Sequence, residues 1–298
     1  MAVFRRGYQR YNGPLTGSFA RLLVMPRFAW ARILSHRFVV VLMMASLFWP
    51  LACISFIYLS NHADRLLGGM NLGNGAAKML RINGQFFSVF MGVQVVFGMI
   101  LAAVAGPGLI APDLANNGLP LYFARPLSRW TYVLSRMIVL LGLLSLVTLI
   151  PGLLVFGMQV SMAGTTWLVA NWTLGAGMAL GFLFWMVMVS LVALTASAYV
   201  KWRVVAGALV LAFFFVTAGA ATIINQVLRV QWGSLLNPGY AMGFVWAALL
   251  GLDPPQDGPE VYEYVISLCV VIAILLAILM RKLRPVEEIG RASCRERV

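Results

Sequence analysis

The stretch MIVLLGLLSLVTLIPGLLVFGMQVSMAGTTWLVANWTLGAGMALGFLFWMVMVSLVALTASAYV, residues 137–200, contains no charged residue. A helix needs about 20 apolar residues to cross the hydrocarbon core of a bilayer, so this stretch is long enough for two spans. The segment GMQVSMAGT at 157–165 is the natural break between them. The stretch therefore predicts two transmembrane helices, about Tyr132–Phe156 and Trp167–Ala198.

The rest of the chain has the same character. Of its 298 residues, 61% are hydrophobic and 10% are charged, whereas a soluble domain carries about 25% charged residues. Four more apolar runs are long enough to span a membrane: Phe38–Leu59, Phe86–Ala105, Val204–Ile224 and Tyr264–Met280. Since a span must satisfy its own backbone hydrogen bonds, we predict an all-α polytopic membrane protein with six transmembrane helices in one domain, residues 38–284.

The net charge of +13 indicates membrane topology and not binding to nucleic acid, because the basic residues lie at the ends of the apolar runs. Fifteen Lys and Arg residues fall on one side of the six predicted spans and four on the other, with the segment 289–298 left out. The basic side is expected to be cytoplasmic. Both termini are then cytoplasmic in a multi-pass protein.

Two segments outside the spans are expected to lie along or within the membrane. Residues 1–37 form a basic cytoplasmic segment in which GSFARLLVMPRFAWARILSHRF mixes apolar residues with arginines, a pattern typical of an interfacial helix, bent near Pro26. Between spans five and six, LLNPGYAMGFVWAALLG is apolar but too short to cross the bilayer. We expect a re-entrant hairpin on the outer side, opened by Asn237 and Pro238.

The tail, residues 285–298, ends in IGRASCRERV, which back-translates as a common sequencing-adapter sequence. We expect residues 289–298 to be adapter read-through and exclude them from the interpretation.

The sequence contains no phosphate loop GxxxxGK[ST] and no HExxH motif, and its two histidines are isolated. We therefore expect no catalytic residue, no metal site and no cofactor on this chain. Polar residues within the spans are few, and no Asp, Glu or Lys is expected at mid-membrane, which argues against an ion-driven transporter. Gln94 and Asn171 either line a substrate path or hydrogen-bond a neighbouring helix.

The link between spans two and three, residues 107–130, is the most polar and turn-rich piece between two spans. Pro107 is expected to end span two, and Asp113 after Pro112 is expected in the first turn of a short helix, where a carboxylate is favoured. Asn116, Asn117 and Gly118 supply a turn. Tyr122 and Phe123 then lie beside Arg125 and Arg129, Ser128 caps span three, and Trp130 and Tyr132 are expected at headgroup level. Spacing alone fits either a docking surface or a loop that re-enters the membrane.

The segment APDLANNGLPLYFARPLSRWTYVLSRM resembles the signature of type-2 ABC transporter permeases. In that family an acidic residue precedes a small-residue turn and a Ser-Arg-Pro-x-Ser-Arg segment that runs into span three. Here Asp113 stands where the family usually has Glu, and Ala124-Arg125-Pro126-Leu127-Ser128-Arg129 has Ala in place of the first Ser. LLNPGYAM at 235–242 resembles the Asn-Pro segment of the outer hairpin.

The resemblance implies the permease subunit of an ATP-driven exporter in a bacterial inner membrane. The substrate path would form with a second permease chain, through spans one, two and five. The interfacial helix and the 107–130 link would contact a separate ATPase subunit, which would hold the ATP and magnesium. The ATPase-coupling residues would be Asp113, Asn116, Asn117, Gly118, Tyr122, Phe123, Arg125, Pro126, Ser128 and Arg129.

Two other interpretations remain at this point. A membrane-embedded transferase would need clustered His, Asp or Glu at the interface, and the outer carboxylates Asp253, Asp257, Glu260 and Glu263 have no His nearby. An assembly scaffold without transport would present the same contact surfaces.

Overall fold

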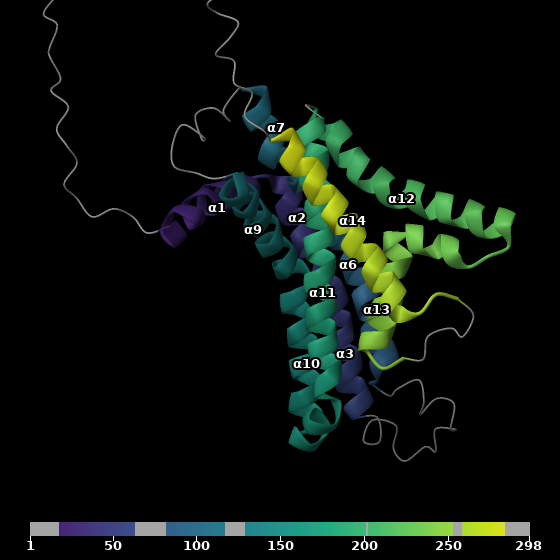
Figure 1. The fold of residues 1–298 in the computed structure, drawn as a ribbon. Helices are drawn as coiled ribbons and strands as arrows, with labels where there is room; N and C mark the ends of the chain where they lie inside the picture. The colour runs from purple at the N-terminus through teal and green to yellow at the C-terminus, as the bar shows by residue number, and fades with distance from the viewer. Residues whose placement is uncertain (1–17, 63–81, 117–128, 201, 253–257, 284–298) are drawn as a thin grey trace, which may run out of the picture.

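The computed structural model describes residues 18–62, 82–116, 129–200, 202–252 and 258–283. In these ranges the chain is almost entirely helical and contains no strand (Figure 1). The helices are α1 (Ser18–Leu34), α2 (Arg37–Ser46), α3 (Phe48–Asn61), α6 (Gly84–Ala105), α7 (Pro107–Ala115), α9 (Arg129–Val147), α10 (Leu149–Ala163), α11 (Thr165–Tyr199), α12 (Arg203–Leu228), the short 3₁₀ turn η1 (Trp232–Leu236), α13 (Pro238–Leu249) and α14 (Val261–Lys282).

Six helical segments are long and apolar enough to cross a membrane, which confirms the six-span prediction at this level. They cover Arg37–Asn61, Gly84–Ala115, Arg129–Ala163, Thr165–Tyr199, Arg203–Leu228 and Val261–Lys282. The charge-free stretch does contain two of them, and the break falls at Gly164 inside the predicted 157–165 segment. Gly164 has φ +85°, a left-handed conformation that glycine adopts without strain.

Helix α11 is the centre of the bundle. It is the most buried of the six segments and contacts α6, α7, α9, α10, α12, α13 and α14. Glycines allow this close packing. A Cβ at Gly177 would lie 2.5 Å from the Leu249 carbonyl oxygen, and one at Gly181 would lie 2.6 Å from the Trp246 ring. The Trp246 indole also donates to the Gly181 carbonyl at 3.1 Å. The small residues of α11 therefore serve helix contact.

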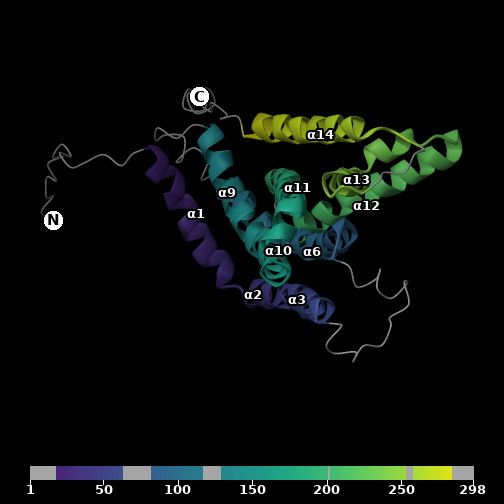
Figure 2. The ribbon, with the colours of Figure 1, turned by 90° about the horizontal axis from the view of Figure 1, so that it is seen from below.

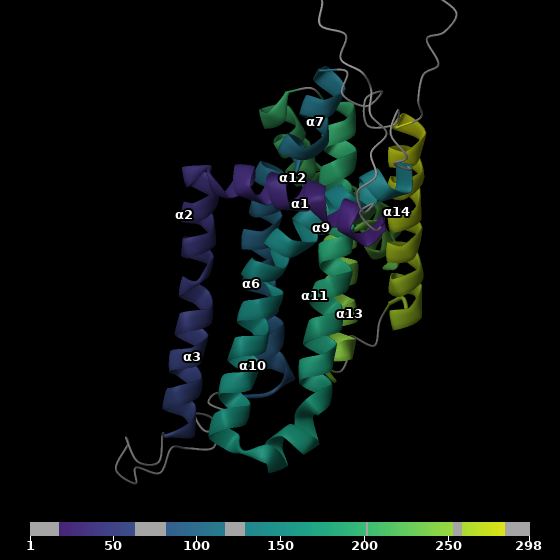
Figure 3. The ribbon, with the colours of Figure 1, turned by 90° about the vertical axis from the view of Figure 1, so that its left-hand side faces the viewer.

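Helix α1 runs crosswise to the long helices at one end of the bundle (Figures 2 and 3). It is fixed to span three by Trp30, whose indole Nε1 donates to the Val139 carbonyl at 2.9 Å. The Trp30 ring also lies over Gly142, where a Cβ would approach it to 2.0 Å. The helix and its Pro26 are present as expected. Its position at the membrane interface stays a prediction.

Spans one and three are each interrupted near a proline. Span one breaks at Leu47 between α2 and α3, and span three breaks at Thr148 between α9 and α10. Pro50 and Pro151 have no N–H, so the carbonyls four residues earlier, Ser46 and Val147, lose their usual helical partner.

The side chain of Gln94 satisfies both of these carbonyls. Gln94 lies in α6 and is fully buried. Its Nε2 donates to the Ser46 carbonyl at 3.3 Å and also to the Val147 carbonyl. One amide therefore joins three spans at the level of their breaks, since unpaired backbone carbonyls are costly in hydrocarbon.

The segment between spans five and six contains η1 and α13. Asn237 caps α13, accepting from the backbone N–H groups of Gly239 and Tyr240 at 3.1 and 3.2 Å, and Pro238 occupies the first turn. α13 packs against α14, α11 and α12. A short apolar helix thus follows the Asn-Pro pair, and its re-entrant position in the membrane stays a prediction.

Replacing Gln94 with Leu should leave the buried carbonyls of Ser46 and Val147 without the donor that Gln94 supplies. We expect a loss of about 1–2 kcal/mol in the free energy of unfolding. In a Pro50→Ala/Pro151→Ala background the missing N–H groups return, and the same replacement should cost about half as much or less. Unfolding in mixed micelles of all four proteins measures both values. An equal cost in the two backgrounds would contradict the role given to Gln94.

Candidate functional site

The candidate site lies at the two ends of the link between spans two and three. The structure describes the link up to Asn116 and again from Arg129. Most of the predicted ATPase-coupling residues lie outside the described residues: Asn117, Gly118, Tyr122, Phe123, Arg125, Pro126 and Ser128. What the structure shows is how the chain is held on either side of them.

The sequence had indicated that Pro107 ends span two, and this prediction was wrong. α6 ends at Ala105, but Gly106 keeps helical angles and Pro107 begins α7 directly. Proline is well suited to this first position because its missing N–H has no helical acceptor there. The helix thus continues to Ala115 and carries Asp113 with it.

The prediction for Asp113 was therefore wrong in position. Asp113 lies in the last turn of α7 and not in a first turn, because the helix starts at Pro107 and includes Pro112. A carboxylate is disfavoured at the negative end of a helix, so this charge needs a partner from elsewhere.

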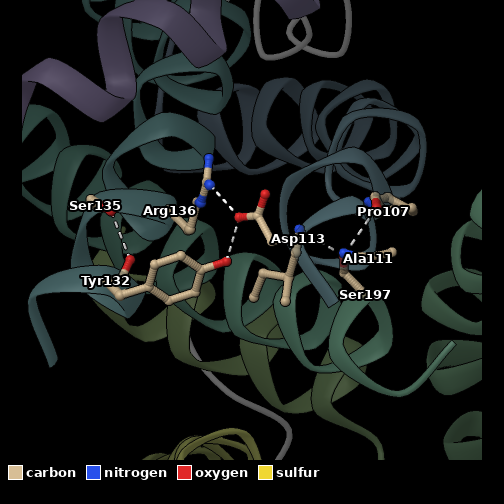
Figure 4. A network of polar contacts seen from close by, with 8 residues as sticks. Pro107, Ala111, Asp113, Tyr132, Ser135, Arg136 and Ser197 are labelled. Atoms are coloured by element: carbon tan, nitrogen blue, oxygen red, sulfur yellow. Dashed lines mark hydrogen bonds and ion pairs between the residues drawn. The ribbon is translucent and has the colours of Figure 1, made fainter. Parts of the chain in front are cut away.

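Span three supplies that partner. Asp113 Oδ2 forms an ion pair with Arg136 Nη2, and it also accepts a hydrogen bond from the Tyr132 hydroxyl at 2.7 Å (Figure 4). The Arg136 guanidinium carbon lies 5.2 Å from the centre of the Tyr132 ring. The side chains of Asp113 and Arg136 are only 18% and 10% exposed. Partial burial strengthens the pair and makes the loss of either member costly.

The headgroup level expected for Trp130 and Tyr132 stays a prediction, but the structure gives their side chains different surroundings. The side chain of Tyr132 is fully buried, whereas Trp130 is 60% exposed. The two residues lie two positions apart and so point to different sides of α9. The hydroxyl of Tyr132 finds its partner in Asp113, as a buried tyrosine requires.

Helix α11 holds the other side of α7 through Ser197. The Ser197 hydroxyl donates to the Pro107 carbonyl at 3.0 Å and accepts from the backbone N–H groups of Ile110 and Ala111 at 3.1 and 3.0 Å (Figure 4). Pro107 O and Ala111 N are the two groups that pair within a regular helix. One buried serine therefore inserts into the first turn of α7 and fixes it to α11.

Together these contacts form what we call the link clamp: Asp113, Tyr132, Arg136 and Ser197. Asp113 lies four residues before the segment 117–128, and Tyr132 lies four residues after it. The clamp fastens both ends of the link to each other and to the central helix. Among the clamp residues only Asp113 was singled out from the sequence. Arg136 had been counted as a topology signal, though a basic residue inside a span is itself a sign of a buried partner.

The other candidates are scattered. Asn116 is the exposed cap of α7, and Arg129 is the first residue of α9. Gln94 contacts helices, as described above. Asn171 lies at a kink in α11 with φ −127° and donates to the Trp167 carbonyl of its own helix at 3.0 Å. In the described part of the chain, no group of three or more His, Cys, Asp or Glu side chains gathers as a metal site.

Comparisons of the chain with protein-family models and with curated proteins found no match. A functional proposal therefore rests on the six candidate spans and on the link clamp between spans two and three.

The ion pair can be tested by a double-mutant cycle. Arg136→Gln alone should cost about 2–4 kcal/mol in the free energy of unfolding, because it leaves a largely buried carboxylate unpaired. Asp113→Asn with Arg136→Gln should cost less than the sum of the two single variants. Arg281→Gln, at an exposed position in the last turn of α14, is the control and should change stability by about 0.5 kcal/mol or less. Additive single effects would show that the pair is not coupled.

Ser197→Ala should destabilise the protein by about 2 kcal/mol, because it removes three hydrogen bonds and leaves two buried N–H groups. Ser161→Ala is the matched control, since the exposed Ser161 hydroxyl bonds only within its own helix. Hydrogen exchange at Ile110 and Ala111 should accelerate in the Ser197 variant alone. Unchanged exchange there would contradict the contact.

Proposed function

We propose that this chain is the permease subunit of an ATP-driven ABC exporter, working with a second permease chain and a separate ATPase subunit. The observation that carries the proposal is the link clamp. A loop that only connects two spans needs no buried ion pair at its base, whereas a docking element does need rigid ends if force is to pass through it.

The mechanism follows from the connections of the link. An ATPase dimer that closes on ATP would push the segment between Asn116 and Arg129. Asp113 and Arg136 would make α7 and α9 move together, and Ser197 would carry the displacement to α11. Such rigid-body movement of spans would alternate access to a path between two permease chains. ATP hydrolysis would take place on the ATPase subunit, and this chain would transmit the resulting movement to its spans.

The resemblance of residues 111–137 to type-2 permeases supports the same assignment, with Arg125 and Arg129 as the basic part of the docking surface. The cytoplasmic placement of the link rests on the excess of Lys and Arg at this end. A bacterial inner membrane is the location that goes with this family.

The proposal predicts that the tagged chain, extracted in mild detergent from its native host, brings down an ATPase with a phosphate loop. Arg125→Glu with Arg129→Glu should lower the recovered ATPase about tenfold or more, because a rim charge reversal opposes docking. Arg229→Glu with Arg281→Glu, at exposed positions outside α1 and the link, is the control pair and should leave recovery within about twofold. Recovery of the permease without any ATPase would overturn the proposal, and equal recovery from both pairs would remove the link as the docking element.

A further inference from the structure

A cavity of about 170 Å³ lies where three spans end beside helix α1. Its lining includes Arg32 and His36 near the end of α1, Phe38 at the start of α2, Val104 and Gly108 at the junction of α6 and α7, and Arg203 at the start of α12. None of these residues belongs to the link clamp. Helix α1, which supplies part of the lining, lies at the same end of the bundle as α7 (Figure 3).

The polar residues that line the cavity include two arginines, Arg32 and Arg203, together with His36. Within the described ranges the one ion pair joins Arg136 to Asp113, so neither Arg32 nor Arg203 has a carboxylate partner there. The volume is large enough for a phosphate group. Guanidinium groups bind phosphate oxygens in a fixed planar geometry.

Two helix starts add to the positive field. α2 begins at Arg37 and α12 begins at Arg203, and residues at both starts line the cavity. Neither helix has a side-chain cap among the described residues. The first N–H groups of an uncapped helix favour an anion.

The opposite wall of the cavity is apolar and opens toward the lipid. Phe38 is 62% exposed and Val104 is 40% exposed on the outer surface of the bundle. Phe38 and Arg203 lie in the first turns of spans one and five, where the apolar core of a bilayer gives way to headgroups. Val104 lines the same cavity from near the end of α6. A ligand here meets cations at one end and hydrocarbon at the other.

We propose that this cavity binds the phosphate headgroup of an anionic phospholipid, with the acyl chains lying along Phe38 and Val104. The lipid would join α1 to spans one, two and five. This site goes beyond the transport proposal and does not depend on it. A free phosphate ion would use the cationic wall alone, and the apolar wall distinguishes the lipid from it.

The test is thermal unfolding of the full purified chain in nonionic detergent during titration with phosphatidylglycerol. We expect a rise of about 5 °C in the midpoint at saturation. Phosphatidylcholine should give a several-fold weaker response, and inorganic phosphate should give none. Stabilisation by phosphate equal to that by phosphatidylglycerol would assign the site to a free anion, and an equal response to phosphatidylcholine would remove the headgroup selectivity. Either result overturns the proposal.

Two variants locate the effect. Arg32→Gln with Arg203→Gln should weaken the apparent affinity for phosphatidylglycerol by about fivefold or more, because each arginine contributes to headgroup attraction. The control pair Arg27→Gln with Arg281→Gln removes the same charge from exposed positions outside the cavity and should change the affinity less than about twofold. Equal losses in both pairs would mean general surface attraction and would refute the site.

Gly108→Leu offers a test that changes no charge. A Cβ at Gly108 meets no atom within 4 Å, so the new side chain can enter the cavity without strain. We expect this variant to fold, to unfold at or near the native midpoint without lipid, and to lose most of the response to phosphatidylglycerol. A full response in Gly108→Leu would contradict binding in this cavity, whatever happens in the arginine variants.

Discussion

The arrangement of the spans depends on one rule, that a carbonyl group inside hydrocarbon must have a hydrogen-bond donor. Pro50 and Pro151 break this rule in two different spans, and a single amide, Gln94, repairs both breaks. The same side chain therefore fixes the relative height and rotation of α2, α6 and α9. Apolar packing alone would not do this, because one leucine-rich surface slides over another with little preference in lipid. The polar contact gives spans one, two and three a defined register, and the glycines of α11 bring this central helix close to α10, α6 and α13.

A similar principle governs the end of the bundle that carries the link. α7 is short, Pro112 removes one of its internal hydrogen bonds, and its final turn carries a charge that the helix itself disfavours. Neighbouring helices hold it in place: Ser197 from α11 bonds its first turn, and Tyr132 and Arg136 from α9 meet Asp113. An element that is weak alone is in this way made rigid by its surroundings. That rigidity is what a coupling element needs, since a flexible base would dissipate any push applied to the link.

The sequence was enough to predict the helical membrane class and six spans, because length and apolar composition alone determine these features, although spans two and three extend past their predicted ends to Ala115 and Ala163. It also located the break near Gly164 and the short apolar segment that begins at Asn237 and Pro238, which depend on local residue types. It failed where distant residues decide the outcome. Asp113 was placed in a first turn because Pro112 looked like a helix start, and only the continuation from α6 reveals Pro107 as the true start. Arg136 and Tyr132 looked like topology and headgroup residues, and their shared partner lies in another helix. The docking residues between 117 and 128 remain predictions.

The interruption at Thr148 divides span three into two rods, and the Leu47 interruption divides span one beside it. The first half of span three, α9, is held to α1 by the hydrogen bond of Trp30 and to α7 by the ion pair of Arg136. The second half, α10, packs against α3 and α11. Under the transport proposal, a force that enters at the clamp reaches α9 first, and Gln94 joins α9 to α2 and α6 at the level of the two breaks. The near halves of spans one, two and three would then move as one body, and the breaks at Leu47 and Thr148 mark where the far halves of spans one and three would change their angle to it.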